Sequence, residues 1–140
     1  MAKPTLVEPV RSVADAVGRS AMALVTLSAL GAFLLSAHGI SRGSAGSEWL
    51  EIWRSGGLFM FSVLFAIVTL RPRLSPGLWE LAFLHKIVLA AAAPFSSDPE
   101  ALISGFVDLI LAMVIAASYA LTKGWQGWRT MPAVPPHRST

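Results

Sequence analysis

Four long apolar stretches divide this chain, and they constrain its fold more than any motif does. The spans that we expect cover about residues 20–39, 52–70, 76–93 and 100–122. Charged residues make up only 14% of the 140 residues, whereas soluble domains average about 25%. About 20 consecutive apolar residues are needed to cross the hydrocarbon core of a bilayer. The sequence therefore predicts an all-α protein whose fold is a four-helix transmembrane bundle.

Local signals predict where the last two spans begin and end. Ser75 precedes Pro76 and Asp98 precedes Pro99, and a capping residue followed by proline is typical of a helix N-terminus. Pro94 is expected to end the third span, because proline breaks the hydrogen-bond ladder of a helix. No clear small-x-small cleavage site follows the first span, so we expect that span to be retained instead of being removed as a signal peptide.

Residues 20–122 are expected to form one domain, with a shorter segment on each side. Residues 1–19 form a predicted cytoplasmic N-terminal segment. Its apolar residues recur at helical spacing: Val7, Val10, Ala14 and Val17. This spacing suits a short amphipathic helix lying on the membrane surface, and an unstructured leader is the alternative. Residues 123–140, which end in a stretch rich in proline and polar residues, are predicted to be a disordered cytoplasmic tail.

Basic residues are concentrated at alternate ends of the spans. They precede the first span, join the second to the third and follow the fourth: Lys3, Arg11, Arg19, Arg71, Arg73, Lys123, Arg129 and Arg138. Loops with this composition stay in the cytoplasm according to the positive-inside rule. We therefore expect an integral, multi-pass membrane protein with both termini cytoplasmic. Because the basic residues form no single block, we expect no nucleic-acid partner.

Two charged residues, Lys86 and Asp108, lie deep inside the third and fourth spans. Asp108 lies roughly eight residues, or ~12 Å, from the outer end of its span, and Lys86 lies ~12–14 Å from the inner end of its own. Consecutive helices joined by a short turn are usually antiparallel neighbours, so the two side chains are expected to meet near the middle of the bilayer. Small residues share their faces: Ala82, Ala90 and Ala93 with Lys86, and Ala101, Gly105, Ala112 and Ala116 with Asp108. Charges in such positions usually face the protein interior and often mark a functional site.

Asp108, Lys86 and His85 are accordingly the candidate catalytic residues. Together they could perform acid–base chemistry, with His85 as the group that titrates near neutrality. The alternative is a structural ion pair that fixes the register of two helices, with His85 bonded to a backbone carbonyl or a serine. No cofactor or metal site is predicted, because the chain has no cysteine and no metal-binding, phosphate-binding or serine-nucleophile motif. His38 with Glu48 and Glu51 is interpreted as a solvated loop in preference to a weak metal site.

Three functions fit these features. The favoured one is an accessory or structural membrane subunit with a buried Lys/Asp polar centre. The alternatives are a membrane-embedded acid–base enzyme acting on a lipophilic substrate and a proton-coupled transporter or channel. The expected partners are membrane lipids, and in addition a protein partner, a second copy of the chain or a lipophilic small molecule. The order of the spans resembles that of small four-span proteins of the DoxX-like kind, a resemblance that covers span order alone and implies no site residue.

Overall fold

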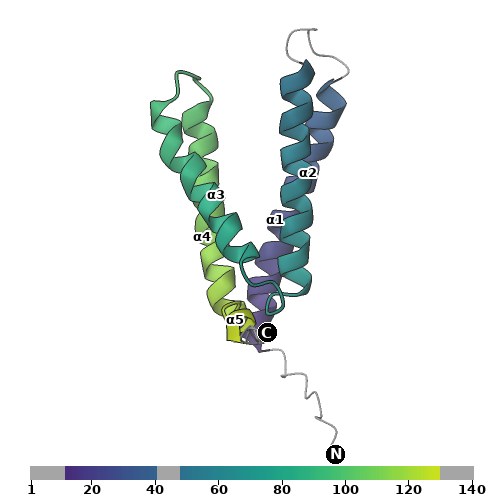
Figure 1. The fold of residues 1–140 in the computed structure, drawn as a ribbon, viewed down its shortest axis with the longest axis vertical. Coiled ribbons are helices and arrows are strands. Elements are labelled where there is room, and N and C mark those ends of the chain that lie inside the picture. Colours follow the sequence, from purple (N-terminus) through teal and green to yellow (C-terminus); the bar gives the residue numbers. More distant parts are fainter. Residues whose placement is uncertain (1–11, 41–47, 130–140) are drawn as a thin grey trace, which may run out of the picture.

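The computed structural model describes residues 12–40 and 48–129, and within these ranges the chain consists of helices joined by turns and short loops, with no strand (Figure 1). The elements are α1 (Val13–Ile40), α2 (Glu48–Leu70), α3 (Leu78–Ala92), the 3-10 turn η1 (Ala93–Phe95), α4 (Ala101–Thr122) and α5 (Gln126–Arg129). Four helices are long and apolar enough to cross a membrane: α1, α2, α3 together with η1, and α4. The prediction of an all-α chain with four span-length helices is therefore confirmed.

The four long helices form two antiparallel hairpins, α1–α2 and α3–α4, which diverge like the arms of a V (Figure 1). The hairpins meet at the end that carries the start of α1, the α2–α3 loop and α5, which we call the joined end. They separate towards the opposite end, which we call the open end. The sequence predicted four spans in a bundle, but it did not predict that the bundle is closed at one end only.

The apolar core lies in the half of the molecule nearest the joined end. Its buried residues come from all four long helices: Met22, Val25, Phe65, Val68, Trp79, Ala82 and Ile115. No described apolar residue of α1 after Val25, or of α2 before Phe65, is buried. Within the first hairpin, the open half is held by a hydrogen bond of 2.7 Å between the Ser36 and Ser55 hydroxyls. The two hairpins are therefore packed together near the joined end and are largely separate beyond it.

Small residues permit the closest helix contacts. A Cβ atom added at Gly18 of α1 would lie 2.9 Å from the Thr122 side chain of α4, and one added at Gly105 of α4 would collide with Ala93. Backbones that approach this closely require glycine or another small residue at the interface. The predicted small-residue face of α4 is thus used at Gly105, but it does not continue to Ala116, which is exposed. Nearer the joined end, Ile115 is the residue that α4 buries in the core.

The predicted start of the third span is wrong by two residues. Helix α3 begins at Leu78, and its N-cap is Gly77, whose φ of 84° is in the left-handed region. Glycine adopts this conformation without strain. The Ser75 hydroxyl, predicted to cap the helix, instead donates a hydrogen bond of 2.8 Å to the carbonyl of Arg71. At the start of α4, Asp98 accepts a hydrogen bond of 2.9 Å from the backbone N–H of Glu100, close to the predicted cap.

The flanking segments differ from their predictions where the structure describes them. Residues 13–19 are the first turns of α1 and so continue into the first span instead of forming a separate short helix; Asp15 is buried there and Val17 is exposed. The rest of the predicted surface helix, residues 1–11, lies outside the described residues. At the other end, the part of the predicted disordered tail that precedes residue 130 is folded: Lys123 ends α4 with a φ of 55°, and α5 follows, with Gly127 buried. Residues 130–140 also lie outside the described residues.

Candidate functional site

Lys86 of α3 and Asp108 of α4 form an ion pair across the seam of the second hairpin. The Lys86 Nζ donates a hydrogen bond to Oδ1 of Asp108 at 2.5 Å. Each side chain is 13% exposed. The structure thus brings together Lys86 and Asp108, the two charges that were predicted to meet from their depth in the spans and from the small residues on their faces.

The ion pair is enclosed by close helix packing on both sides. Ala82 and Ala112, one helical turn away towards the joined end, are both fully buried. Towards the open end, Gly105 packs against Ala93 so tightly that a Cβ atom at Gly105 would collide with it. Because small residues hold α3 and α4 together on either side, the long lysine side chain reaches the short aspartate without leaving the seam.

The ring of Phe61, from α2, covers the pair from the first hairpin. His85 stacks on Phe61 with ring centroids 4.1 Å apart and an interplanar angle of 34°. The Lys86 Nζ lies 5.4 Å from the centroid of the same ring, within the range of a cation–π contact. The sequence analysis missed Phe61, because its position depends on how two hairpins pack, and neither depth nor periodicity along one helix reports that.

His85 lies beside the ion pair without joining it. No hydrogen bond links His85 to Lys86 or Asp108 in the described part of the chain, and its Nδ1 is buried without a hydrogen-bond partner there. The expected bond to a backbone carbonyl or a serine is therefore not made by Nδ1. Chemically, the arrangement consists of a paired acid and base, shielded by an aromatic ring, with one unbonded imidazole nitrogen next to them.

A second charged cluster, missed by the sequence analysis, lies at the joined end. The Asp15 carboxylate, only 1% exposed, accepts hydrogen bonds from Arg19 at 2.9 Å and from Arg73 at 2.6 Å. Arg19 also donates to the backbone carbonyls of Thr69 and Leu70, at 3.1 Å each. The cluster ties the start of α1 to the end of α2 and to the α2–α3 loop. The four-residue spacing of Asp15 and Arg19 was the available signal, but Arg19 was interpreted only as one of the basic residues that set the orientation.

The charges near the open end are isolated by comparison. Arg54 lies 3.8 Å from Glu51, with the two side chains 66% and 32% exposed. The interpretation of Glu48 and Glu51 as part of a solvated loop is wrong, because both lie in the first turn of α2. Among the described residues, no group of three histidine, cysteine, aspartate or glutamate side chains could hold a metal ion. His38 and Glu48, considered together in the sequence analysis, are both exposed.

Comparison with protein-family models, with curated proteins and with solved structures found no match. The resemblance in span order to DoxX-like proteins therefore gains no support from these comparisons. The function has to be inferred from the geometry of the polar pair and from the faces that the two hairpins leave open.

Proposed function

We propose that this protein is a small multi-pass integral membrane protein that acts as an accessory or structural subunit. In this proposal the Lys86–Asp108 pair fastens α3 to α4 inside the bilayer. The membrane location is supported by the four long helices, which expose large apolar side chains along most of their length. Helices that are apolar on all sides need a surrounding as apolar as a protein core or a bilayer.

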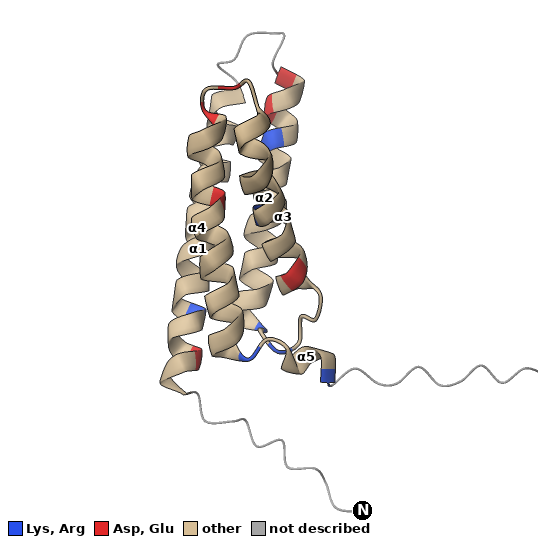
Figure 2. Ribbon diagram, turned by 90° about the vertical axis from the view of Figure 1, so that its left-hand side faces the viewer, with Lys and Arg blue, Asp and Glu red and all other residues tan. Residues whose placement is uncertain are grey.

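The distribution of charge supports an orientation for the protein in the membrane. Acidic residues cluster at the open end, and most of the arginines and lysines lie towards the joined end (Figure 2). The positive-inside rule then places the joined end on the cytoplasmic side. Since α1 begins and α5 ends at the joined end, the proposal has both termini in the cytoplasm.

The observation that carries the subunit proposal is the apolar crevice between α2 and α3. It has a volume of about 350 Å³ and only apolar side chains line it: Met60, Phe61, Val63, Leu64, Ile67, Leu78 and Leu81. A self-sufficient four-helix bundle would close such a crevice by packing α2 on α3. We infer that an apolar transmembrane segment of a protein partner occupies it, because transmembrane helices associate mainly through close van der Waals packing.

The geometry of the polar pair favours a structural role over a catalytic one. Lys86 and Asp108 are hydrogen-bonded to each other, and close packing of small residues encloses them on both sides. A catalytic acid or base needs an open position within hydrogen-bond reach of its substrate. A buried ion pair that is already satisfied is a well-attested way to fix the register of two helices.

A specific observation keeps the acid–base enzyme as a second candidate. The Nδ1 atom of His85 is buried next to the pair without a partner in the described residues, and buried polar atoms are normally hydrogen-bonded. A lipophilic substrate with a hydroxyl or carbonyl group would satisfy it. Under this alternative, Asp108→Asn abolishes turnover of that substrate while the protein remains folded.

The subunit proposal is tested by purifying the tagged chain from its native membrane in mild detergent and measuring native mass. We expect a complex of fixed stoichiometry that is heavier than the 14.9 kDa chain. Val63→Trp, which fills the crevice between α2 and α3, should release the partner. Ile103→Trp, at an exposed position of α4 outside the crevice, is the matched control and should retain it. A monodisperse monomer, or equal loss of the partner in both variants, would contradict the proposal.

A further inference from the structure

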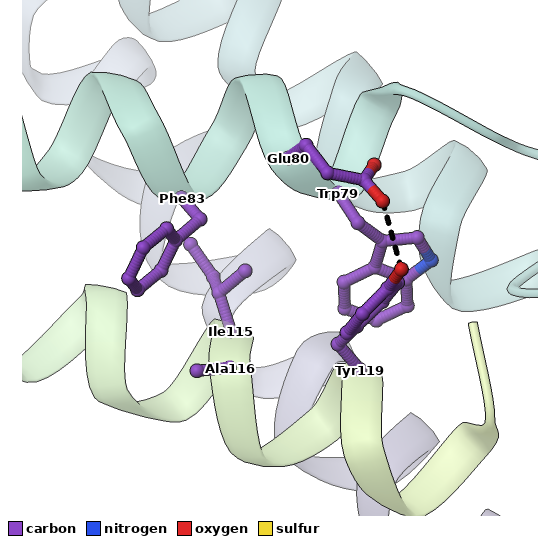
Figure 3. Close-up of a pocket in the computed structure, with 6 residues that line it drawn as sticks. All are labelled: Trp79, Glu80, Phe83, Ile115, Ala116 and Tyr119. Atoms are coloured by element: carbon purple, nitrogen blue, oxygen red, sulfur yellow. Dashed lines mark hydrogen bonds between the residues drawn. The ribbon is translucent and has the colours of Figure 1, made fainter. Parts of the chain in front are cut away.

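A separate pocket, independent of the subunit role, lies at the joined end between the start of α3 and the end of α4 (Figure 3). Its volume is about 210 Å³, and its lining consists of Trp79, Glu80, Phe83, Ile115, Ala116 and Tyr119. Three of these six side chains are aromatic, and Glu80 supplies a carboxylate. The pocket thus has aromatic rings in its lining and a negative charge beside it, at the joined end of the molecule.

The aromatic rings of this pocket are held in place by contacts outside it. The Trp79 indole donates a hydrogen bond of 3.0 Å to the carbonyl of Pro72, and the ring is only 2% exposed. Trp79 and Tyr119 have centroids 5.7 Å apart, and Tyr119 in turn contacts Trp125 edge-on at 5.8 Å. Such a chain of ring contacts favours a preformed site over one that is assembled only when a ligand binds.

Glu80 keeps an unused charge beside this pocket, whose own lining is almost entirely apolar. Its Oε1 atom accepts hydrogen bonds from the Tyr119 hydroxyl at 2.8 Å and from the Trp128 indole at 2.9 Å. Both donors are neutral, so they orient the carboxylate and stabilise its charge without cancelling it. No lysine or arginine in the described ranges forms an ion pair with Glu80, and its side chain is exposed. The negative charge is therefore available to a ligand.

We propose that this pocket binds the ammonium group of an amphipathic organic cation, with quaternary ammonium as the best fit. Aromatic rings attract such cations through their faces, and aromatic cages for quaternary ammonium groups work in this way. Because Trp79 is only 2% exposed, the rings of the pocket with surface left to meet the cation are those of Phe83, which is 39% exposed, and Tyr119. The carboxylate of Glu80 adds a full opposite charge, and the neighbouring apolar surface of the helices accommodates the ligand's hydrocarbon tail. Two sources share this chemistry: the headgroup of a choline lipid and a free lipophilic cation.

The test compares two surfactants added at low mole fraction to the full-length protein in nonionic micelles. Dodecyltrimethylammonium and dodecyldimethylamine N-oxide have the same tail and similar heads, but only the first carries a net charge at neutral pH. With binding followed by the change in tryptophan fluorescence, we expect the ammonium compound to bind with an affinity roughly tenfold higher than that of the N-oxide. Equal affinities for the two compounds would overturn the proposal.

Variants locate the binding to this pocket. Glu80→Gln keeps an acceptor for Tyr119 but removes the charge, so it should abolish the preference for the ammonium compound. Glu48→Gln makes an equal change of charge at the exposed start of α2 and should leave the preference for the ammonium compound unchanged. Phe83→Leu removes a ring but keeps apolar volume, and should weaken binding several-fold even if Glu80→Gln fails to fold. A preference for the ammonium compound that is unchanged in both Glu80→Gln and Phe83→Leu would place the binding elsewhere and refute the proposal.

A competition experiment distinguishes the two sources of the cation. Dihexanoyl phosphatidylcholine that displaces dodecyltrimethylammonium from the wild-type protein would assign the pocket to a lipid headgroup. Failure to displace it would assign the pocket to a free organic cation. Neither result depends on a protein partner in the α2–α3 crevice, so this inference can fail while the subunit proposal stands.

Discussion

Removing one member of the Lys86–Asp108 pair should destabilise the protein far more than removing both. Lys86→Met leaves a carboxylate in the α3–α4 seam without its partner, and Asp108→Ala leaves an ammonium group there. The double variant leaves two apolar side chains in a seam already built of small residues such as Gly105 and Ala112. The comparison of single and double variants therefore measures what the pair contributes.

The expected magnitude follows from the burial of the pair. Both side chains are only 13% exposed, and the Lys86 Nζ and Asp108 Oδ1 atoms are 2.5 Å apart. The free energies typical of buried ion pairs therefore apply, and not those of exposed pairs. Breaking a buried pair by removing one partner costs about 3–5 kcal/mol, whereas replacing both by apolar residues is often close to neutral. For a domain of about this size, a loss of ~3 kcal/mol lowers the melting temperature by roughly 10 °C or more.

The assay is thermal unfolding of wild type, the two single variants and the double variant in one nonionic detergent, monitored by near-ultraviolet circular dichroism. Arg54→Met is the matched control, because it breaks the exposed pair with Glu51, whose atoms are 3.8 Å apart. Exposed pairs contribute about 0–1 kcal/mol, so this control should melt close to wild type. The reasoning is refuted if the double variant loses as much stability as the two single variants together, or if neither single variant melts below Arg54→Met.

Three further predictions concern the joined end, the helix seam and transport. Asp15→Asn should cost about 3 kcal/mol, because two arginine side chains share this buried carboxylate; chemical unfolding in micelles measures the loss, and a change within error of zero would contradict it. Gly105→Ala should destabilise by about 1–3 kcal/mol through its clash with Ala93. Gly57→Ala should instead stabilise its helix by up to about 1 kcal/mol, because the added Cβ meets no atom within 4 Å. A melting temperature of Gly105→Ala above that of Gly57→Ala would be inconsistent with the packing described. If the pair carries protons, liposomes should show a flux driven by a pH gradient that Lys86→Met removes, whereas the structural role predicts no such flux.

The parts of the structure that were predictable from the sequence depend on position along a single helix or across one short turn. Four apolar stretches predicted four span-length helices. The depths of Lys86 and Asp108, and the small residues beside them, predicted a meeting of the two charges, because α3 and α4 are consecutive and antiparallel. The first inference needs only the length of each apolar stretch. The second needs the helical rise and the short turn at residues 94–100.

The features that could not be predicted depend on contacts between helices or loops that are far apart in the sequence. Patterns within one helix do not report how such elements pack. Phe61 covers His85 and Lys86 because the two hairpins approach at that height, and no periodicity in α2 reports this. The burial of Asp15 depends on two partners, Arg19 on the next turn and Arg73 from a distant loop, and the second cannot be read from the sequence around Asp15. Helix α5 similarly contacts α3 through a hydrogen bond from Trp128 to Glu80, a contact that follows only from tertiary structure.

The claim that α3 and α4 cross the membrane is tested most directly by cysteine accessibility. The chain has no cysteine, so single cysteines can replace Leu74 in the α2–α3 loop, Ser97 between α3 and α4, and Val107 within α4. With a membrane-impermeant maleimide, the account predicts labelling of the cysteine at 97 in intact cells, labelling at 74 only after permeabilisation, and no labelling at 107 in either condition. Labelling of positions 74 and 97 from the same side, or reaction at 107 as fast as in the loops, would contradict it.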